Sequence, residues 1–177
     1  SGLTTITPFT FVIMFRFTAN GGFTILQFGG GSGVSGNSLW MFDVLSTGSA
    51  YPGTMRTWYL NNIYSGYDTA LVVNTWYIMT YKYSGGLLSS ATVRINGLNK
   101  TLGAVGDGTP TTALSNVWAL PQFSGGGSIY YGGMYLNNTA MSLSNIEKVE
   151  GFFAHRMFSN GSMLTPSHPY YSVAPTF

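Results

Sequence analysis

The chain has 177 residues, a length that suits one domain with its own hydrophobic core. Charged residues make up only 7% of it and the few basic ones are scattered, so the sequence indicates no surface for nucleic acid or anionic lipid. The lack of cysteine excludes disulfides and thiolate metal sites. No apolar run approaches the ~20 residues of a membrane span, so we expect no membrane insertion.

Short strands separated by turns follow one another along most of the chain. Phe9–Phe17 alternates with a period of two, which predicts a long strand with one aromatic face buried. Asn96-Gly97 predicts a two-residue type I′ hairpin, because both positions of that turn need a positive φ. The predicted strands are Phe9–Phe17, Phe23–Phe28, Ser38–Val44, Met55–Asn61, Trp76–Tyr83, Thr92–Asn96, Leu98–Leu102, Asn116–Leu120 and Ile129–Leu136.

This pattern predicts an all-β fold, a two-sheet antiparallel jelly-roll sandwich. We expect a single jelly-roll domain over residues 1–170, which opens with an extended segment, 1–8. We also expect residues 171–177 to form an extended C-terminal tail, because the prolines near the end disfavour an ordinary central strand.

The stretch SNIEKVEGFFAHRM, residues 144–157, changes to helical periodicity. Ser144 with Glu147 three residues later predicts a capping box at the start of the helix. The apolar stripe expected to dock on a sheet consists of Ile146, Val149, Phe153 and Met157. Glu150 is then expected on the solvated face, while Gly151 allows a close approach to the sheet.

This helix and the chain after it resemble the C-terminal signature of laminin-G/concanavalin A-like jelly rolls, modules found in phage virion and bacterial surface proteins. The matching residues are Leu143, Ser144, Ile146, Glu150, Gly151, Phe152, Phe153, Ala154 and His168-Pro169-Tyr170. The chain departs from that signature after the helix, where 156–158 replace a Lys-Trp-Gly-Leu run. The resemblance implies a jelly roll that binds glycans or serves structurally.

The sequence does not favour catalysis. Glycoside hydrolases use two carboxylates flanking the scissile bond, whereas both glutamates lie on the predicted helix and the aspartates are far apart. These acidic residues are Asp43, Asp68, Asp107, Glu147 and Glu150. The chain also has no cysteine nucleophile and no G-x-S-x-G elbow. We therefore expect a non-enzymatic protein with no catalytic residues.

No metal site is expected either. His155 and His168 have no evident ligand partner, which argues against zinc. Asp68 and Asp107 are candidate calcium ligands, but calcium needs several oxygen ligands and usually more than one carboxylate. We therefore expect no cofactor.

Aromatic residues are the main candidates for binding, because sugar faces stack on Trp and Tyr. The candidate carbohydrate-binding residues in RTWYLNNIYSGY are Trp58, Tyr59, Asn61, Asn62, Tyr64 and Tyr67. For Trp76 and Trp118 we expect the alternative fate of a strand tryptophan, which is to fill the core. Three sequons make candidate N-glycosylation sites of Asn99, Asn137 and Asn160.

Two functions are compatible with these features. The low charge, the mean hydropathy of +0.17 and the extended ends favour a structural subunit that assembles with copies of itself. It would form, or decorate, an extracellular filament or a virion surface. The alternative is a lectin-like module for cell-surface polysaccharide, which the resemblance and the aromatic segment favour. Both place the protein at an extracellular surface or on a virion.

Overall fold

The computed structural model describes residues 8–19, 23–28, 40–44, 54–59, 63–87, 90–103, 118–119 and 127–177. The first of two antiparallel sheets contains, in spatial order, β11 (Ile129–Asn137), β1 (Phe9–Phe17), β6 (Trp76–Tyr83), β7 (Thr92–Ile95) and β8 (Leu98–Lys100). The second contains β10 (Trp118–Ala119), β2 (Phe23–Phe28), β3 (Trp40–Val44), β4 (Thr54–Tyr59), β5 (Ile63–Ala70) and β9 (Leu102–Gly103). In this second sheet only the Ile25 side chain is described. One helix, α1 (Leu143–Phe158), completes the fold.

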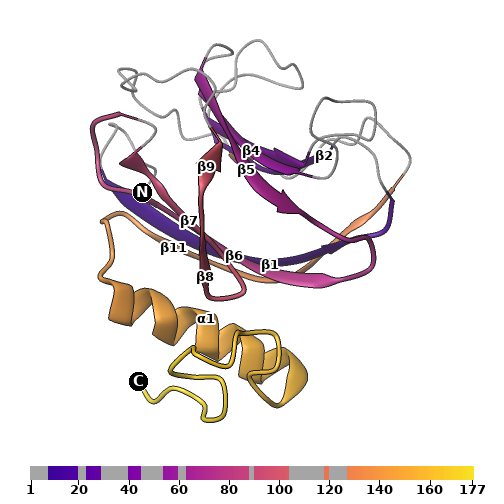
Figure 1. The fold of residues 1–177 in the computed structure, drawn as a ribbon, viewed down its shortest axis with the longest axis vertical. Helices are drawn as coiled ribbons and strands as arrows, with labels where there is room; N and C mark the ends of the chain where they lie inside the picture. The colour runs from indigo at the N-terminus through magenta and orange to yellow at the C-terminus, as the bar shows by residue number, and fades with distance from the viewer. Residues whose placement is uncertain are drawn as a thin grey trace.

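The elements form three layers, with the five-stranded sheet between the six-stranded sheet and α1 (Figure 1). The core between the sheets is largely aromatic and includes Ile25 of β2 beside the odd-numbered residues of β1. The Tyr131 hydroxyl of β11 donates a hydrogen bond to the carbonyl oxygen of Ile25 at 2.8 Å, which links the two sheets directly. The mostly antiparallel β structure with one helix agrees with the all-β prediction.

Strand β1 is buried on both faces, which goes beyond the single aromatic face predicted from its alternation. Its odd-numbered residues, from Phe9 to Phe17, face the inter-sheet core as expected. On the other face, Val12 and Met14 pack in a second cluster with residues of α1. Because β1 lies between β11 and β6 and under the helix, both sets of side chains are removed from water.

The predicted hairpin between β7 and β8 is confirmed. Asn96 and Gly97 have φ angles of 51° and 83°, and Ile95 pairs with Leu98 across the turn. Asn96 also bonds both backbone groups of Ile78, accepting from its N–H with Oδ1 and donating to its carbonyl, each at 2.8 Å. The turn residue therefore continues the ladder to β6.

Each predicted strand overlaps an observed one, with ends that differ by a few residues. The segment predicted as Leu98–Leu102 divides into β8 and β9, which belong to different sheets. Strand β5 was not predicted, because its sequence IYSGYDTA lacks a clear period of two. Its pairing with β4 is also irregular, since the register shifts between Thr54 and Arg56.

The N-cap of helix α1 lies two residues earlier in the chain than the sequence suggested. Ser142 is the N-cap residue, and its side chain accepts a hydrogen bond from the Asn145 N–H at 3.3 Å, so the assignment of Ser144 as the cap is wrong. The start is fixed from β1: the Thr10 hydroxyl donates to Thr139 O at 3.0 Å and accepts from Met141 N at 2.9 Å. Within the described part of the chain, no helix has the length and apolar character of a membrane span.

We expect Ser142→Ala to lower the free energy of unfolding by about 1 kcal/mol, the usual cost of removing a capping hydroxyl. Ser144→Ala, at an exposed position of the first turn, should change it by less than about 0.5 kcal/mol. Urea unfolding of the two variants measures both values. Equal losses in the two would contradict the assignment of the cap to Ser142.

The buried face of α1 partly matches the predicted stripe. Ile146, Val149 and Phe153 are buried, as predicted, but Met157 is 41% exposed. Phe153 lies over Gly133 of β11, where an added Cβ would be 2.6 Å from Phe153 Cε1. The close approach to the sheet therefore depends on Gly133.

Candidate functional site

Four of the six predicted carbohydrate-binding residues, Trp58, Tyr59, Tyr64 and Tyr67, lie on β4 and β5, and the other two, Asn61 and Asn62, lie outside the described residues. Trp58 and Tyr64 are cross-strand partners, whereas Tyr59 pairs with Ile63. Their role in binding stays a prediction.

The remaining predicted sites are placed as follows. Asp68 lies on β5 and Asp107 lies outside the described residues; among the described residues, no group of three or more His, Cys, Asp or Glu could hold a metal ion. Of the sequon residues, Asn99 accepts from Arg94, and Asn137 accepts from the Thr139 N–H at 3.0 Å. Asn160 is exposed and accepts from the Ser162 N–H at 3.0 Å. Glycosylation of these residues stays a prediction.

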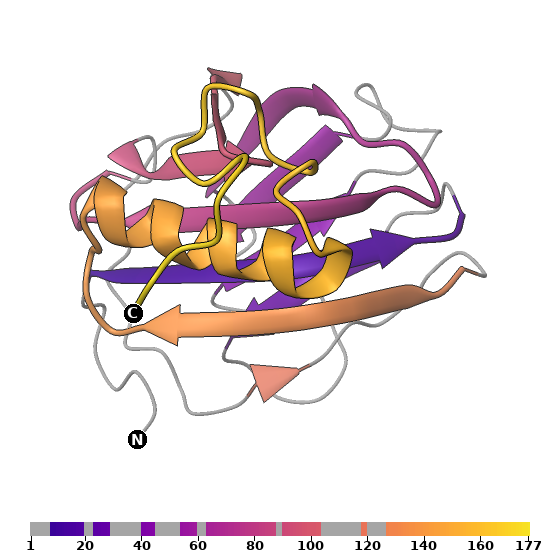
Figure 2. The ribbon, with the colours of Figure 1, turned by 90° about the horizontal axis from the view of Figure 1, so that it is seen from below.

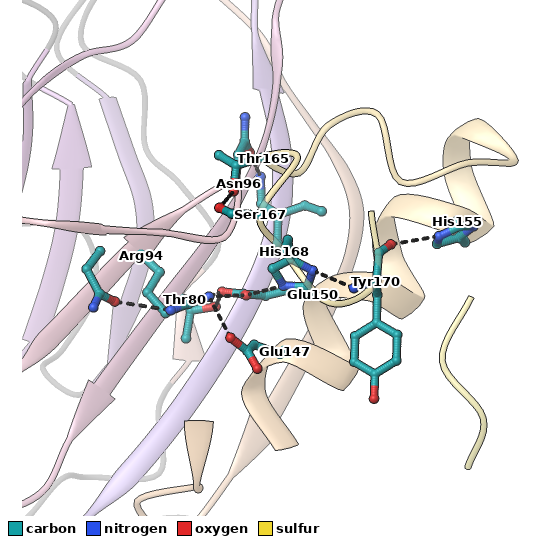
Figure 3. A network of polar contacts seen from close by, with 12 residues as sticks. Thr80, Arg94, Asn96, Glu147, Glu150, His155, Thr165, Ser167, His168 and Tyr170 are labelled. Atoms are coloured by element: carbon teal, nitrogen blue, oxygen red, sulfur yellow. Dashed lines mark hydrogen bonds and ion pairs between the residues drawn. The ribbon is translucent and has the colours of Figure 1, made fainter. Parts of the chain in front are cut away.

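A buried carboxylate, Glu150 of α1, lies at the centre of a polar network that joins the helix, the five-stranded sheet and the C-terminal segment (Figure 3). Its Oε1 accepts hydrogen bonds from Thr80 Oγ1 at 2.7 Å and from Arg94 Nε at 2.9 Å. Its Oε2 accepts from Arg94 Nη2 at 3.0 Å and lies 3.1 Å from His168 Nε2. Glu150 is 0% exposed, so the prediction of a solvated position is wrong.

His168 is held in one tautomer by its neighbours. Its Nδ1 accepts the backbone N–H of Tyr170 at 3.1 Å, so this nitrogen carries no proton. Nε2 therefore carries the proton and donates a hydrogen bond to Oε2 of Glu150. The ring also contacts the β7–β8 hairpin, where a Cβ at Gly97 would lie 2.6 Å from His168 Cδ2. His168, for which only packing was expected, thus ties the C-terminal segment to helix and sheet.

The Glu150 carboxylate remains charged in this setting. Burial alone would raise its pKa, but the hydrogen bonds from His168 and Arg94, the charge of Arg94 and the hydrogen bond from Thr80 hold the pKa below its ordinary value. Both carboxylate oxygens are already occupied by donors, and the other glutamate, Glu147, lies 3.7 Å from Arg94 Nη2. The two glutamates therefore hold α1 on the five-stranded sheet through Arg94, and no oxygen of Glu150 is left for a substrate.

The C-terminal segment packs along α1 through two further contacts. His155 Nε2 lies 2.9 Å from the carbonyl oxygen of Tyr170. A Cβ at Gly151 would lie 2.6 Å from the Cβ of Tyr170, so Gly151 allows the close approach of this segment. The expectation that Gly151 faces the sheet is therefore wrong.

A second cluster, which sequence reasoning missed, lies on the outer face of the five-stranded sheet. Arg16 of β1 pairs in register with Trp76 of β6 on one side and with Tyr130 of β11 on the other. Its guanidinium carbon lies 5.5 Å from the centroid of the Trp76 ring and 4.7 Å from that of Tyr130. We call these three residues the Arg16 row.

The Arg16 row lies next to the C-terminal end of α1. The ring of Phe158, the last residue of the helix, meets that of Trp76 edge to face, with 6.5 Å between centroids. Figure 2 shows β1 and β11 continuing past this end of the helix. Tyr130 is 47% exposed, while Arg16 and Trp76 are half-buried. Trp76 therefore packs against the helix cluster rather than in the inter-sheet core, and the side chain of Trp118 is not among those described.

The Arg16 guanidinium makes no hydrogen bond and no ion pair with any residue that the structure describes, and its Nε is buried without a partner. An arginine carries five N–H donors in a planar fork that matches a carboxylate. The sequence signal was an isolated charge within an otherwise uncharged strand of a chain with only 7 Lys and Arg residues. Geometrically, the row offers a cation between two aromatic rings at the molecular surface.

Three solved structures show a similar fold. A Trypanosoma rangeli sialidase in complex with sialic acid has a TM-score of 0.55 and 15% identity, covering 85% of this chain and 23% of its own. Botulinum neurotoxin type C, described as interacting with two ganglioside molecules, has a TM-score of 0.57 and 13% identity, covering 85% and 37%. The binding domain of botulinum neurotoxin DC, in complex with rat synaptotagmin II, has a TM-score of 0.55 and 14% identity, covering 83% and 36%. No family model matches the chain, and no curated protein matches it either.

At these identities the likeness concerns the fold alone. The chain spans between 23% and 37% of the length of the three structures, which are therefore much larger molecules. The likeness supports a β-rich fold, which agrees with the all-β class expected from the sequence. They do not establish the laminin-G/concanavalin A-like family.

Proposed function

We propose that this protein is a non-enzymatic carbohydrate-binding domain with a concanavalin A-like jelly-roll sandwich. The observation that carries the proposal is the similarity of fold to a sialidase bound to sialic acid and to a neurotoxin described as interacting with gangliosides. A shared fold does not fix function, so the proposal also depends on the chemistry of the chain's own side chains.

Those side chains favour binding over cleavage. The Glu150 carboxylate is buried, and donors from Thr80, Arg94 and His168 occupy its oxygens. A glycosidase acid or nucleophile must instead present an oxygen to the scissile bond. Aromatic residues at the surface, such as Tyr130, suit the apolar faces of sugar rings.

The comparisons favour this function over a filament or virion subunit. None of the three neighbours is described as a component of such an assembly. We accordingly propose glycans as the partners, calcium-independent binding, and an extracellular surface as the place where the protein meets them. Assembly with copies of itself stays a prediction.

A glycan array probed with the folded protein tests the function. We expect binding to a defined subset of glycans, and a loss of at least about tenfold in affinity for the Trp58→Ala/Tyr64→Ala variant, because truncating a central aromatic contact commonly costs more than 1 kcal/mol. Tyr171→Ala, at an exposed tyrosine of the C-terminal segment, is the matched control and should bind normally. Absence of glycan binding by the wild type, together with ordered assemblies in electron micrographs, would support the structural-subunit alternative instead.

A further inference from the structure

The Arg16 guanidinium has no counter-charge among the residues that the structure describes. The two glutamates whose side chains are described both face Arg94, Glu150 at 2.9 Å and Glu147 at 3.7 Å. Arg16 is half-buried, and in the described part of the chain the electron-rich faces of Trp76 and Tyr130 lie beside its guanidinium. A cation in such partly desolvated surroundings interacts more strongly with an incoming anion than one in open water.

We propose that the Arg16 row binds the carboxylate of an acidic sugar, such as a sialic or uronic acid. This inference rests on the proposed carbohydrate-binding function and adds a second site, distinct from Trp58 and Tyr64, with the class of sugar that it takes. The planar guanidinium can bind a carboxylate with two parallel N–H···O bonds. A neutral sugar has no charged group with two such acceptor oxygens. A carboxylate thereby supplies acceptors for the terminal Nη1 and Nη2 groups of Arg16, which make no hydrogen bond to a described residue.

The two rings give the site its preference for a sugar over a simple anion. Tyr130 has an exposed ring and a hydroxyl that can exchange hydrogen bonds with sugar hydroxyls. Trp76 offers a half-buried indole, and Phe158 at the end of α1 bounds the site on that side. The strand register supports the same assignment. Because the three residues of the row are register partners on neighbouring strands, the site is preorganised.

Isothermal titration with 3′-sialyllactose and with lactose, its neutral counterpart, tests the proposal. We expect the wild type to bind sialyllactose at least tenfold more tightly than lactose. Arg16→Gln should remove about ten- to a hundredfold of the affinity for sialyllactose, because hydrogen bonds to a charged group are lost, and leave lactose unaffected. Arg16→Lys, which keeps the charge but not the fork, should retain part of the preference.

Arg156→Gln is the matched control. Arg156 also lies near an aromatic ring, 5.9 Å from the centroid of Phe152, but it is exposed on α1 and has a single ring beside it. Its substitution should leave both affinities unchanged. If Arg16→Gln fails to fold, Arg16→Lys decides: a several-fold loss for sialyllactose alone supports the site, and an unchanged affinity overturns it.

The two proposals fail in different ways. A wild type that binds neutral glycans, with no preference for acidic ones and no effect of Arg16→Gln, overturns the acidic-sugar site and leaves the carbohydrate-binding function intact. A wild type that binds neither sialyllactose nor any glycan of an array overturns both. In that case Arg16 serves only to hold β6, β1 and β11 together through its two rings.

Discussion

Replacing Glu150 by Gln is expected to lower the free energy of unfolding by about 3–5 kcal/mol, because breaking a buried ion pair leaves the partner charge uncompensated. Glu150 is fully buried and Arg94 is almost so. Whichever oxygen the amide N–H₂ group replaces, it would face an N–H of Arg94, which cannot accept a hydrogen bond. The expected loss of free energy of unfolding is a large share of the total stability of an ordinary domain. Thermal and urea unfolding would measure it.

Glu147→Gln is the matched control, since the Glu147 side chain is 21% exposed and its Oε1 lies 3.7 Å from Nη2 of the same arginine. We expect it to cost less than about 1 kcal/mol, as for an exposed ion pair. A Glu150→Gln variant as stable as Glu147→Gln would show that the buried network does not hold the helix to the sheet.

The same network gives the wild type a definite pH dependence. The pKa of Glu150 is lower in the folded than in the unfolded chain, where it is near 4.5, so its contribution to stability is fully present above about that value. The contribution is lost as the pH falls further, through the folded pKa. Stability of the wild type should therefore decrease on acidification below pH about 4.5 more steeply than that of Glu150→Gln, which has no proton to take up.

Glu150 shows what helical periodicity can predict and what it cannot. The pattern identified an amphipathic helix and its buried residues Ile146 and Phe153 correctly. It treated every charge as solvated, although Glu150 lies four residues after Ile146 and three before Phe153, on the same face. The ion-pair partner of Glu150 is Arg94, a lone charge between Val93 and Ile95 of a short strand. It lies 56 residues from Glu150 in the sequence. Nothing local connects the two, so the pairing required the fold.

The residues that carry the family resemblance are the ones that meet in this region. Glu150 contacts His168, and Gly151 faces Tyr170, although each pair is separated by almost twenty residues. The signature thus records how the C-terminal segment is fastened to the helix. The capping residue was harder to assign, because Ser142 and Ser144 are both followed three residues later by a polar side chain.

Strands were predictable where one period dominated and were missed where it did not. Phe9–Phe17 alternates throughout and was placed with its observed ends. In β5, Ser65 and Gly66 interrupt the apolar pattern, so no strand was predicted there. The Arg16 row was out of reach for a further reason: its three members are 54 to 114 positions apart and become neighbours only through β1–β6 and β1–β11 pairing.

Phe153→Ala should be comparably destabilising, by about 3–5 kcal/mol, because it removes a buried ring and leaves a cavity between α1 and the sheet. The ring is 7% exposed and belongs to the cluster that includes Val12 and Met14. Phe152→Ala is the matched control: its neighbouring ring is 39% exposed and lies against Phe177 at the chain end. Its cost should be well below that of Phe153→Ala, and chemical denaturation of the pair measures the difference.

The contact with Gly133 makes this prediction sharper. Gly133→Ala alone should destabilise the protein by about 1–3 kcal/mol, because its methyl would lie 2.6 Å from Phe153 Cε1 and would overpack the interface. When Phe153 is truncated to alanine, the same methyl enters the vacated space. The double variant should therefore lose clearly less stability than the sum of the single losses. Strict additivity would mean that the helix does not rest on β11 through these two residues.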